Sequence, residues 1–143
     1  MELYDDIHEA VSDFAGYQRR FTKIRESFEE FFANLNPDTL QIAGMSVELN
    51  ASAGTCEINA FQRKFFATLS PLIIDKELIG HVEFGETIGQ KKTAIERFLI
   101  NSKFVMTLAR KPLIPTSDFS SLQTLYILNL VRQGLSKPVI LAE

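Results

Sequence analysis

The first 35 residues carry a heptad repeat of apolar side chains that no polar residue interrupts. Its two columns are Ile7, Phe14, Phe21, Phe28 and Leu35, and Leu3, Ala10, Tyr17, Ile24 and Phe31. No proline occurs before Pro37, and Asp5 or Asp6 is placed to cap the first turn. The pattern predicts one long helix over residues 1–36. Gly16 is its weak point, because glycine costs about 1 kcal/mol relative to alanine inside a helix, and the sequence leaves open whether the helix continues through it.

From Leu40 onward the spacing of apolar residues changes to two, which is typical of strands. A first strand is expected from Leu40, with a bulge at Gly44 where the alternation changes phase. A second strand begins at Cys56 and continues as far as Leu69, before Pro71 ends it or places it at an edge of the sheet. These segments begin an antiparallel meander.

Later strands follow the same alternation. Residues 78–85 predict a half-buried strand with one solvated face, and residues 98–108 keep one phase long enough to predict a single long strand. Residues 110–115 contain two prolines and are expected to form a rigid connection. Together these patterns predict a curved antiparallel sheet of about four to five strands over residues 40–109.

A closing helix is expected over residues 116–134, with Thr116, Ser117 or Asp118 as its cap. A long N-terminal helix, a curved antiparallel sheet and a C-terminal helix make an α+β fold in which the helices cover one face of the sheet. Its topology is similar to that of cystatin-like and NTF2-like folds. Because this length is usual for one domain and no linker is visible, residues 1–143 are expected to form a single domain.

The predicted N-terminal helix is longer than the predicted sheet is wide. About 28 helical residues reach ~42 Å, whereas four or five strands span only ~19–24 Å from edge to edge. Its phenylalanines are bulky for a two-stranded coiled coil, so its second half is expected to pack on the sheet. The apolar residues of the first half are Leu3, Ile7, Val11 and Phe14. Unless the helix breaks at Gly16, the sequence predicts that these four contact a second copy or another stable protein partner.

Composition excludes several classes of protein. Cys56 is the only cysteine, so neither an internal disulfide nor a cysteine-based zinc cluster can form within one chain. The acidic N-terminus does not resemble a secretory signal, and no apolar run approaches the roughly 20 residues of a membrane-spanning helix. We therefore expect a cytoplasmic protein with no membrane contact. A net charge of −3 argues against nucleic acid as a partner, as does the spread of the basic pairs Arg19-Arg20, Arg63-Lys64, Lys91-Lys92 and Arg110-Lys111.

Residue types suited to catalysis are scarce. Of the two histidines, His81 shares a strand phase with Glu83, as a histidine and its orienting carboxylate would. With Glu57 and Tyr126, they are the candidate polar groups of a small-molecule pocket between helix and sheet. The pattern contains neither the three or four ligands of a metal site nor a nucleophile that can be placed beside His81. No catalytic residue, metal site or cofactor is therefore predicted.

Two functions are consistent with these patterns. The first is a non-enzymatic protein-interaction module, a small acidic adaptor, chaperone or regulator that dimerises through its N-terminal helix. In size, acidity and its combination of end helices with a central sheet, the chain is similar to type III secretion chaperones, although no motif residue carries over. The alternative is a small-molecule-binding protein or enzyme of NTF2-like or cystatin-like architecture, with its pocket between helix and sheet.

Overall fold

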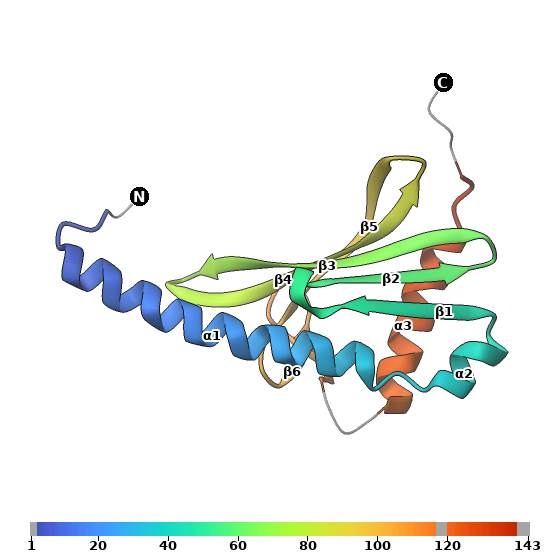
Figure 1. Cartoon of the computed structure of the whole chain (residues 1–143), viewed down its shortest axis with the longest axis horizontal. Helices are drawn as coiled ribbons and strands as arrows, with labels where there is room; N and C mark the ends of the chain where they lie inside the picture. The colour runs from blue at the N-terminus through green and yellow to red at the C-terminus, as the bar shows by residue number, and fades with distance from the viewer. Residues whose placement is uncertain (1–2, 117–119, 140–143) are drawn as a thin grey trace.

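The computed structural model describes residues 3–116 and 120–139 and has the expected α+β architecture (Figure 1). A long N-terminal helix and a C-terminal helix pack on one face of a curled antiparallel sheet. We call this the helix-covered face and the other the open face. The described residues form seven strands, more than the four to five expected.

The N-terminal helix α1 spans Ile7–Ala33 and continues through Gly16 without a break. The Asp6 side chain caps it by accepting a hydrogen bond from the His8 backbone N–H at 2.9 Å. An added Cβ at Gly16 would find only the end of the Arg19 side chain within 4 Å, at 3.8 Å. The glycine therefore lies on an open helix surface, and its propensity cost is too small to interrupt the apolar repeat.

The segment expected to begin the first strand forms a short helix instead. This helix, α2, spans Pro37–Ile42, and the Asn36 side chain caps it by accepting from the Thr39 backbone N–H at 3.1 Å. Proline at the first helical position lacks only an N–H that would have no helical partner. The expectation of a strand from Leu40 was therefore wrong. Gly44, at φ +75°, is a turn before the first strand and not a bulge within it.

Each strand of the sheet pairs antiparallel with the next one in the sequence, so the strand order is simply β1 to β7. A single 3₁₀ turn, η1 (Ala51–Ala53), joins the first two strands. The strands are β1 (Met45–Asn50), β2 (Thr55–Ala60), β3 (Arg63–Ile74), β4 (Glu77–Ile88), β5 (Lys91–Ile100), β6 (Phe104–Met106) and β7 (Pro112–Pro115). Because every connection is local, the sheet forms from hairpins alone.

The predicted second strand is in fact two strands joined by a tight turn. Phe61 and Gln62 both have positive φ, at 52° and 64°, and they reverse the chain between β2 and β3. Pro71 lies opposite Gly80, beyond Thr68, the last residue of β3 that pairs with β2. The proline therefore lies at an edge, where its missing N–H leaves no ladder bond unmade.

The predicted long strand over residues 98–108 also reverses. Strand β5 ends at Ile100, and the Asn101 side-chain oxygen accepts the backbone N–H groups of Lys103 and Phe104, each at 2.8 Å. This side-chain turn starts β6, and the expected rigid connection over 110–115 contributes β7. Both prolines of β7 fit because it is the last strand of the sheet, with one free edge.

The main core lies between the two long helices and the helix-covered face, and a smaller buried cluster of Ile79, Leu99 and Met106 lies on the other face. Phe65 and Phe84 stack at its centre with ring centroids 5.7 Å apart and planes 7° apart. The buried contributions from α1 include Ile24, Phe28, Phe31 and Phe32, and those from the C-terminal helix are Ile127, Leu130 and Val131. The second half of α1 is thus core, as the phenylalanines of its repeat predicted.

The C-terminal helix α3 spans Ser120–Leu135. Residues 117–119 lie outside the described residues, so the expected caps Ser117 and Asp118 are not tested. The helix end is held to the sheet by Arg63, whose guanidinium binds Glu86 and also donates to the carbonyl oxygens of Gly134 and Lys137, at 3.2 and 3.0 Å. This ion pair fixes α3 across the helix-covered face.

Candidate functional site

The first half of α1 extends beyond the tip of the β3–β4 hairpin (Figure 1). We call residues 3–16 the arm. Buried residues of α1 begin only at Ile24, and Tyr17 and Phe21, which are partly buried, mark the transition. The helix overhangs its sheet, as the sequence predicted, but the geometry behind that prediction was wrong. Because α1 runs roughly along the strands and not across them, it extends past the strand ends and not past an edge of the sheet (Figure 1).

The arm exposes the four apolar side chains that the sequence placed at a partner interface. The exposed fractions are 77% for Leu3, 72% for Ile7, 61% for Val11 and 59% for Phe14. Three of them, at positions 7, 11 and 14, recur at helical spacing and form one stripe along the arm. No described part of the chain covers this stripe.

Tyr4 is tied to the first turns of α1 by one hydrogen bond and one aromatic contact. The Tyr4 hydroxyl donates a hydrogen bond to Asp13 Oδ2 at 2.9 Å, and the Tyr4 ring lies 6.3 Å from that of Phe14. Phe14 in turn meets Tyr17 edge to face at 5.6 Å. The hydrogen bond to the Asp13 carboxylate raises the pKa of Tyr4 above its usual value, because ionisation would place two negative charges side by side.

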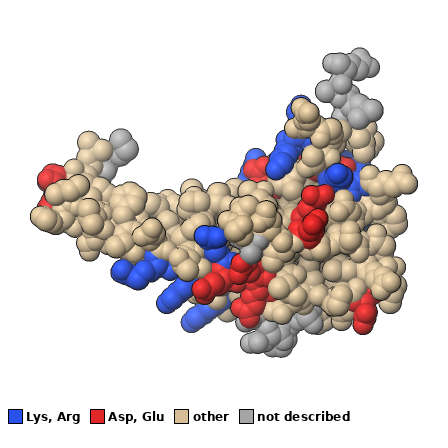
Figure 2. All heavy atoms as spheres, viewed as in Figure 1, with Lys and Arg blue, Asp and Glu red and all other residues tan. Residues whose placement is uncertain are grey.

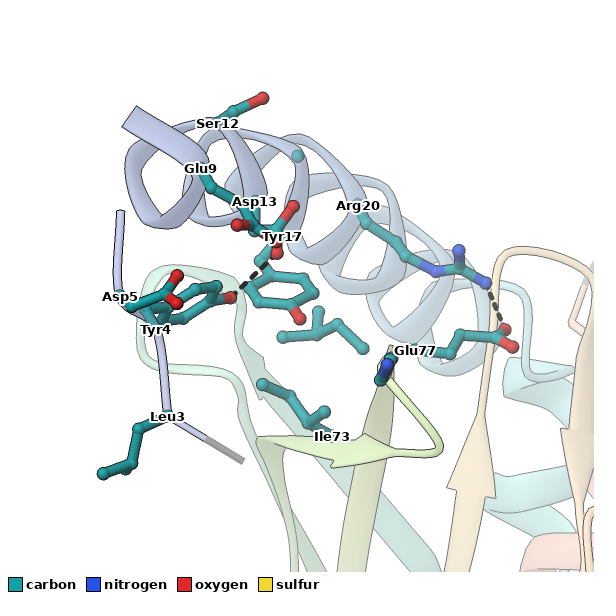
Figure 3. Close-up of a pocket in the computed structure, with 13 residues that line it drawn as sticks. Leu3, Tyr4, Asp5, Glu9, Ser12, Asp13, Tyr17, Arg20, Ile73 and Glu77 are labelled. Carbon is teal, nitrogen blue, oxygen red and sulfur yellow. Dashed lines mark hydrogen bonds and ion pairs between the residues drawn. The ribbon is translucent and has the colours of Figure 1, made fainter. Parts of the chain in front are cut away.

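A cleft of about 870 Å³ separates the arm from the tip of the β3–β4 hairpin (Figure 3). We call it the arm cleft. Tyr4, Tyr17 and Ile73 supply apolar walls, whereas its carboxylates are Asp5, Glu9, Asp13 and Glu77. The sequence pattern did not indicate this cleft, since the arm and the hairpin tip are about 60 residues apart in the chain.

An ion-pair cluster closes the arm cleft at the base of the arm. The Glu77 carboxylate accepts from Arg20 of α1 and, at 2.7 Å, from Arg110 of the β6–β7 loop. The hydrogen bond from Arg110 is the main cause that lowers the pKa of Glu77. The cluster links α1 to the sheet at the point where the helix leaves it, so it positions the arm.

The four residues predicted to line a small-molecule pocket do not all come together. Glu57, His81 and Glu83 alternate with core residues of β2 and β4 and therefore point to the open face. Glu83 forms an ion pair there with Arg97, at 3.5 Å. Tyr126 lies on α3 on the opposite side of the sheet, where its ring meets the side chains of Phe31 and Phe98 at 6.4 and 5.5 Å. The sheet thus separates Tyr126 from the other three.

The remaining side chains that could react or bind a metal are either protonated or too far apart to form a site. Burial raises the pKa of the Cys56 thiol to about 12, so it stays protonated near neutral pH. Burial likewise raises the pKa of Tyr126 to about 12. Among residues 3–116 and 120–139, no three His, Cys, Asp or Glu side chains are grouped as a metal site requires. No helix within these ranges is long and apolar enough to cross a membrane.

Most of this arrangement depends on contacts between distant segments. The exposed apolar stripe was predictable because it needs only helical periodicity and a helix too long for its own sheet to cover. The Tyr4–Asp13, Arg20–Glu77 and Arg63–Glu86 contacts were not, because no local signal pairs these residues. Comparison of the chain with protein-family models, with curated proteins and with solved structures found no match.

Proposed function

We propose that this chain is a non-enzymatic protein-interaction module, a cytoplasmic adaptor, chaperone or regulator that forms a homodimer through its arm. The observation that carries the proposal is the uncovered apolar stripe of Ile7, Val11 and Phe14, extended by Leu3, on a helix that projects from its own sheet. Contiguous exposed apolar surface of this kind is typical of sites of protein contact. In the second half of the same helix, the apolar residues of the repeat are buried against the sheet.

The free energy available from the stripe supports a reversible dimer. Fully burying one large apolar side chain contributes about 1.5–3 kcal/mol, so burying the exposed part of each arm residue contributes about 1–2 kcal/mol. Two copies bring eight such side chains, or about 8–16 kcal/mol, against a cost of association of about 4–15 kcal/mol. The gain and the cost are of similar size, as is expected of a dimer that dissociates on dilution.

The charges of α1 favour antiparallel arms. Residues 3–16 contain four carboxylates and no Lys or Arg, whereas residues 19–25 contain four basic side chains. A parallel pair would bring the eight carboxylates side by side, which is unfavourable. An antiparallel pair brings the acidic tip of one arm level with the basic stretch of the other, and it also opposes the two helix dipoles. The same surface then serves both copies, as two-fold symmetry requires.

Two matched substitutions test the proposal. Val11→Glu places a charge in the middle of the stripe, and Ile42→Glu makes the same change at an apolar residue of α2 that is 89% exposed and lies outside the arm. Sedimentation velocity at several protein concentrations should show a dimer for the unmodified chain and for Ile42→Glu, and a monomer for Val11→Glu. Equal behaviour of the two variants would contradict the assignment of the arm as the interface.

A further inference from the structure

The fold brings basic side chains from two distant segments around one cleft, which we call the basic cleft. It has a volume of about 580 Å³, within the range of about 300–1,000 Å³ for small-molecule sites. Arg19, Arg20 and Lys23 line it from α1, and Lys103 lines it from the β5–β6 turn together with Asn101 and Ser102. The remaining lining residues are Gly16 and Ile24, so no carboxylate belongs to the cleft.

Three of the four cations have no ion-pair partner among the described residues. In the part of the chain that the structure describes, no carboxylate lies within ion-pair distance of Arg19, Lys23 or Lys103. Arg20 is bound to Glu77. Figure 2 shows Lys and Arg side chains gathered along the middle of α1. Unpaired like charges on both walls of a concave site repel one another and concentrate anions from solution.

In each of the other three basic pairs of the sequence, one member has a partner within the protein. Arg63 is bound to Glu86, Arg110 is bound to Glu77, and the Lys92 ammonium lies over the Phe66 ring at 5.1 Å. These contacts account for one member of each of the other three pairs. Lys64, Lys91 and Lys111 also lack an ion pair among the described residues, so the basic cleft differs from the other basic pairs in that three such cations line one concave site.

The neighbouring arm cleft limits the size of the ligand. The two clefts follow one another along α1 and share Gly16 and Arg20. An acidic peptide or a nucleic-acid strand that continued along α1 toward the arm would leave the basic cleft and meet Asp13, Glu9 and Asp5 in the arm cleft. Repulsion there disfavours an extended polyanion, so the complementary ligand is compact and carries several negative charges on few atoms.

Phosphate groups have this chemistry. A guanidinium binds phosphate oxygens through two parallel N–H groups, and lysine ammonium groups add point charges. The Ser102 hydroxyl has no hydrogen-bond partner among the described residues and can donate to a phosphate oxygen. We propose that the basic cleft is a binding site for a small phosphorylated molecule, held between Arg19 and Lys23 of α1 and Lys103 of the β5–β6 turn.

The basic cleft does not include the apolar stripe, although the proposed antiparallel dimer brings the partner's acidic arm tip level with Arg19 and Lys23. At 100° per residue, Arg19 and Lys23 point about 120° and 160° away from Ile7, so they lie on a different side of α1 from the apolar stripe. Titrating the monomeric variant Val11→Glu as well as the unmodified chain separates ligand binding from dimerisation, so either proposal can fail alone. Tripolyphosphate is a suitable probe because it is compact and highly charged.

Calorimetric titration with tripolyphosphate at low ionic strength tests the site. The double variant Lys23→Ala/Lys103→Ala should bind about fivefold to thirtyfold more weakly than the unmodified chain. The matched control Lys91→Ala/Lys111→Ala removes two exposed lysines outside the cleft and should bind with unchanged affinity. An equal loss in both double variants, or no binding by the unmodified chain, would overturn the proposal.

Amide NMR spectra locate the ligand and test its class. Tripolyphosphate should shift the backbone amides of Gly16, Ser102 and Lys103, whereas shifts confined to the β4–β5 turn would place the anion elsewhere. A glutamate-rich peptide and a single-stranded oligonucleotide serve as competing probes. Tighter binding of either than of tripolyphosphate would show that the ligand class is wrong.

Discussion

The ion pair between Arg63 and Glu86 provides a quantitative test of how α3 is held to the sheet. Two short hydrogen bonds of 2.6 Å join the guanidinium to the two carboxylate oxygens, and the side chains are only 18% and 8% exposed. Arg63→Met keeps most of the side-chain volume but leaves the Glu86 carboxylate without its cation. It also removes the donor to the carbonyl groups of Gly134 and Lys137 at the end of α3.

Burial sets the expected magnitude. Exposed ion pairs contribute about 0–1 kcal/mol, whereas removal of one partner from a buried pair costs about 3–5 kcal/mol. Because Arg63 keeps about a fifth of its side-chain surface in water, we expect Arg63→Met to lower the free energy of unfolding by about 2–4 kcal/mol. The double variant Arg63→Met/Glu86→Leu replaces both charges by apolar groups and should recover at least half of this loss.

Urea unfolding followed by circular dichroism measures these differences. The measurement is made at two protein concentrations, because dimerisation adds a concentration-dependent contribution to stability. A loss below about 0.5 kcal/mol for Arg63→Met would show that the pair behaves as an ordinary surface pair. A double variant as unstable as the sum of Arg63→Met and Glu86→Leu would show that the two side chains are not coupled.

Three further expectations concern the core, the thiol and pH. Gly80→Ala should lower the free energy of unfolding by about 1–3 kcal/mol, because an added Cβ would lie 2.7 Å from two isoleucine side chains. An unchanged melting temperature would contradict this packing. Cys56, whose pKa burial raises to about 12, should react with a thiol reagent at pH 8 only after unfolding. Glu77→Gln should reduce stability by at most about 1 kcal/mol at neutral pH and by less in acid. Arg110 lowers the pKa of Glu77 in the folded state. The stabilisation by the Glu77 carboxylate is therefore complete above the unfolded pKa of about 4.3 and is lost as pH falls through the lowered value. A stability difference between Glu77→Gln and the unmodified chain that does not shrink in acid would refute this prediction.

Much of the fold was predictable wherever periodicity alone decides the structure. The heptad columns predicted α1 and its buried second half, and they also predicted the exposed stripe of the arm. Leu40–Ile42 was misassigned because three residues fit either period. The sequence Asn36-Pro37-Asp38 carried the signal for α2, namely a cap followed by proline at the first helical position.

The missing strands reflect turns that the sequence signals weakly. Phe61 and Gln62 adopt positive φ although neither is Gly or Asn, so the β2–β3 hairpin had no turn signature and was assigned as one strand. The turn at Asn101 was readable in principle, because asparagine often accepts backbone N–H groups two or three residues ahead. Apolar residues on both sides of Asn101 share one alternation pattern, so the sequence was assigned as one continuous strand.

The two sets of candidate site residues also differ in how far the sequence could predict them. The partner residues Leu3, Ile7, Val11 and Phe14 follow from one helix and one length estimate, and dimerisation through them stays a prediction. The set His81, Glu83, Glu57 and Tyr126 required knowledge of which face each side chain takes. Strand phase placed His81 and Glu83 on one face, but nothing local showed that Glu57 shares that face or that α3 carries Tyr126 on the other.

The mass of the unmodified chain in solution tests the central claim most directly. Light scattering coupled to size exclusion should give twice the chain mass of 16.2 kDa at tens of micromolar, and the mass should fall toward that of one chain on dilution. A single chain mass at every concentration would show that the arm does not join two copies. It would leave the apolar stripe to a different partner.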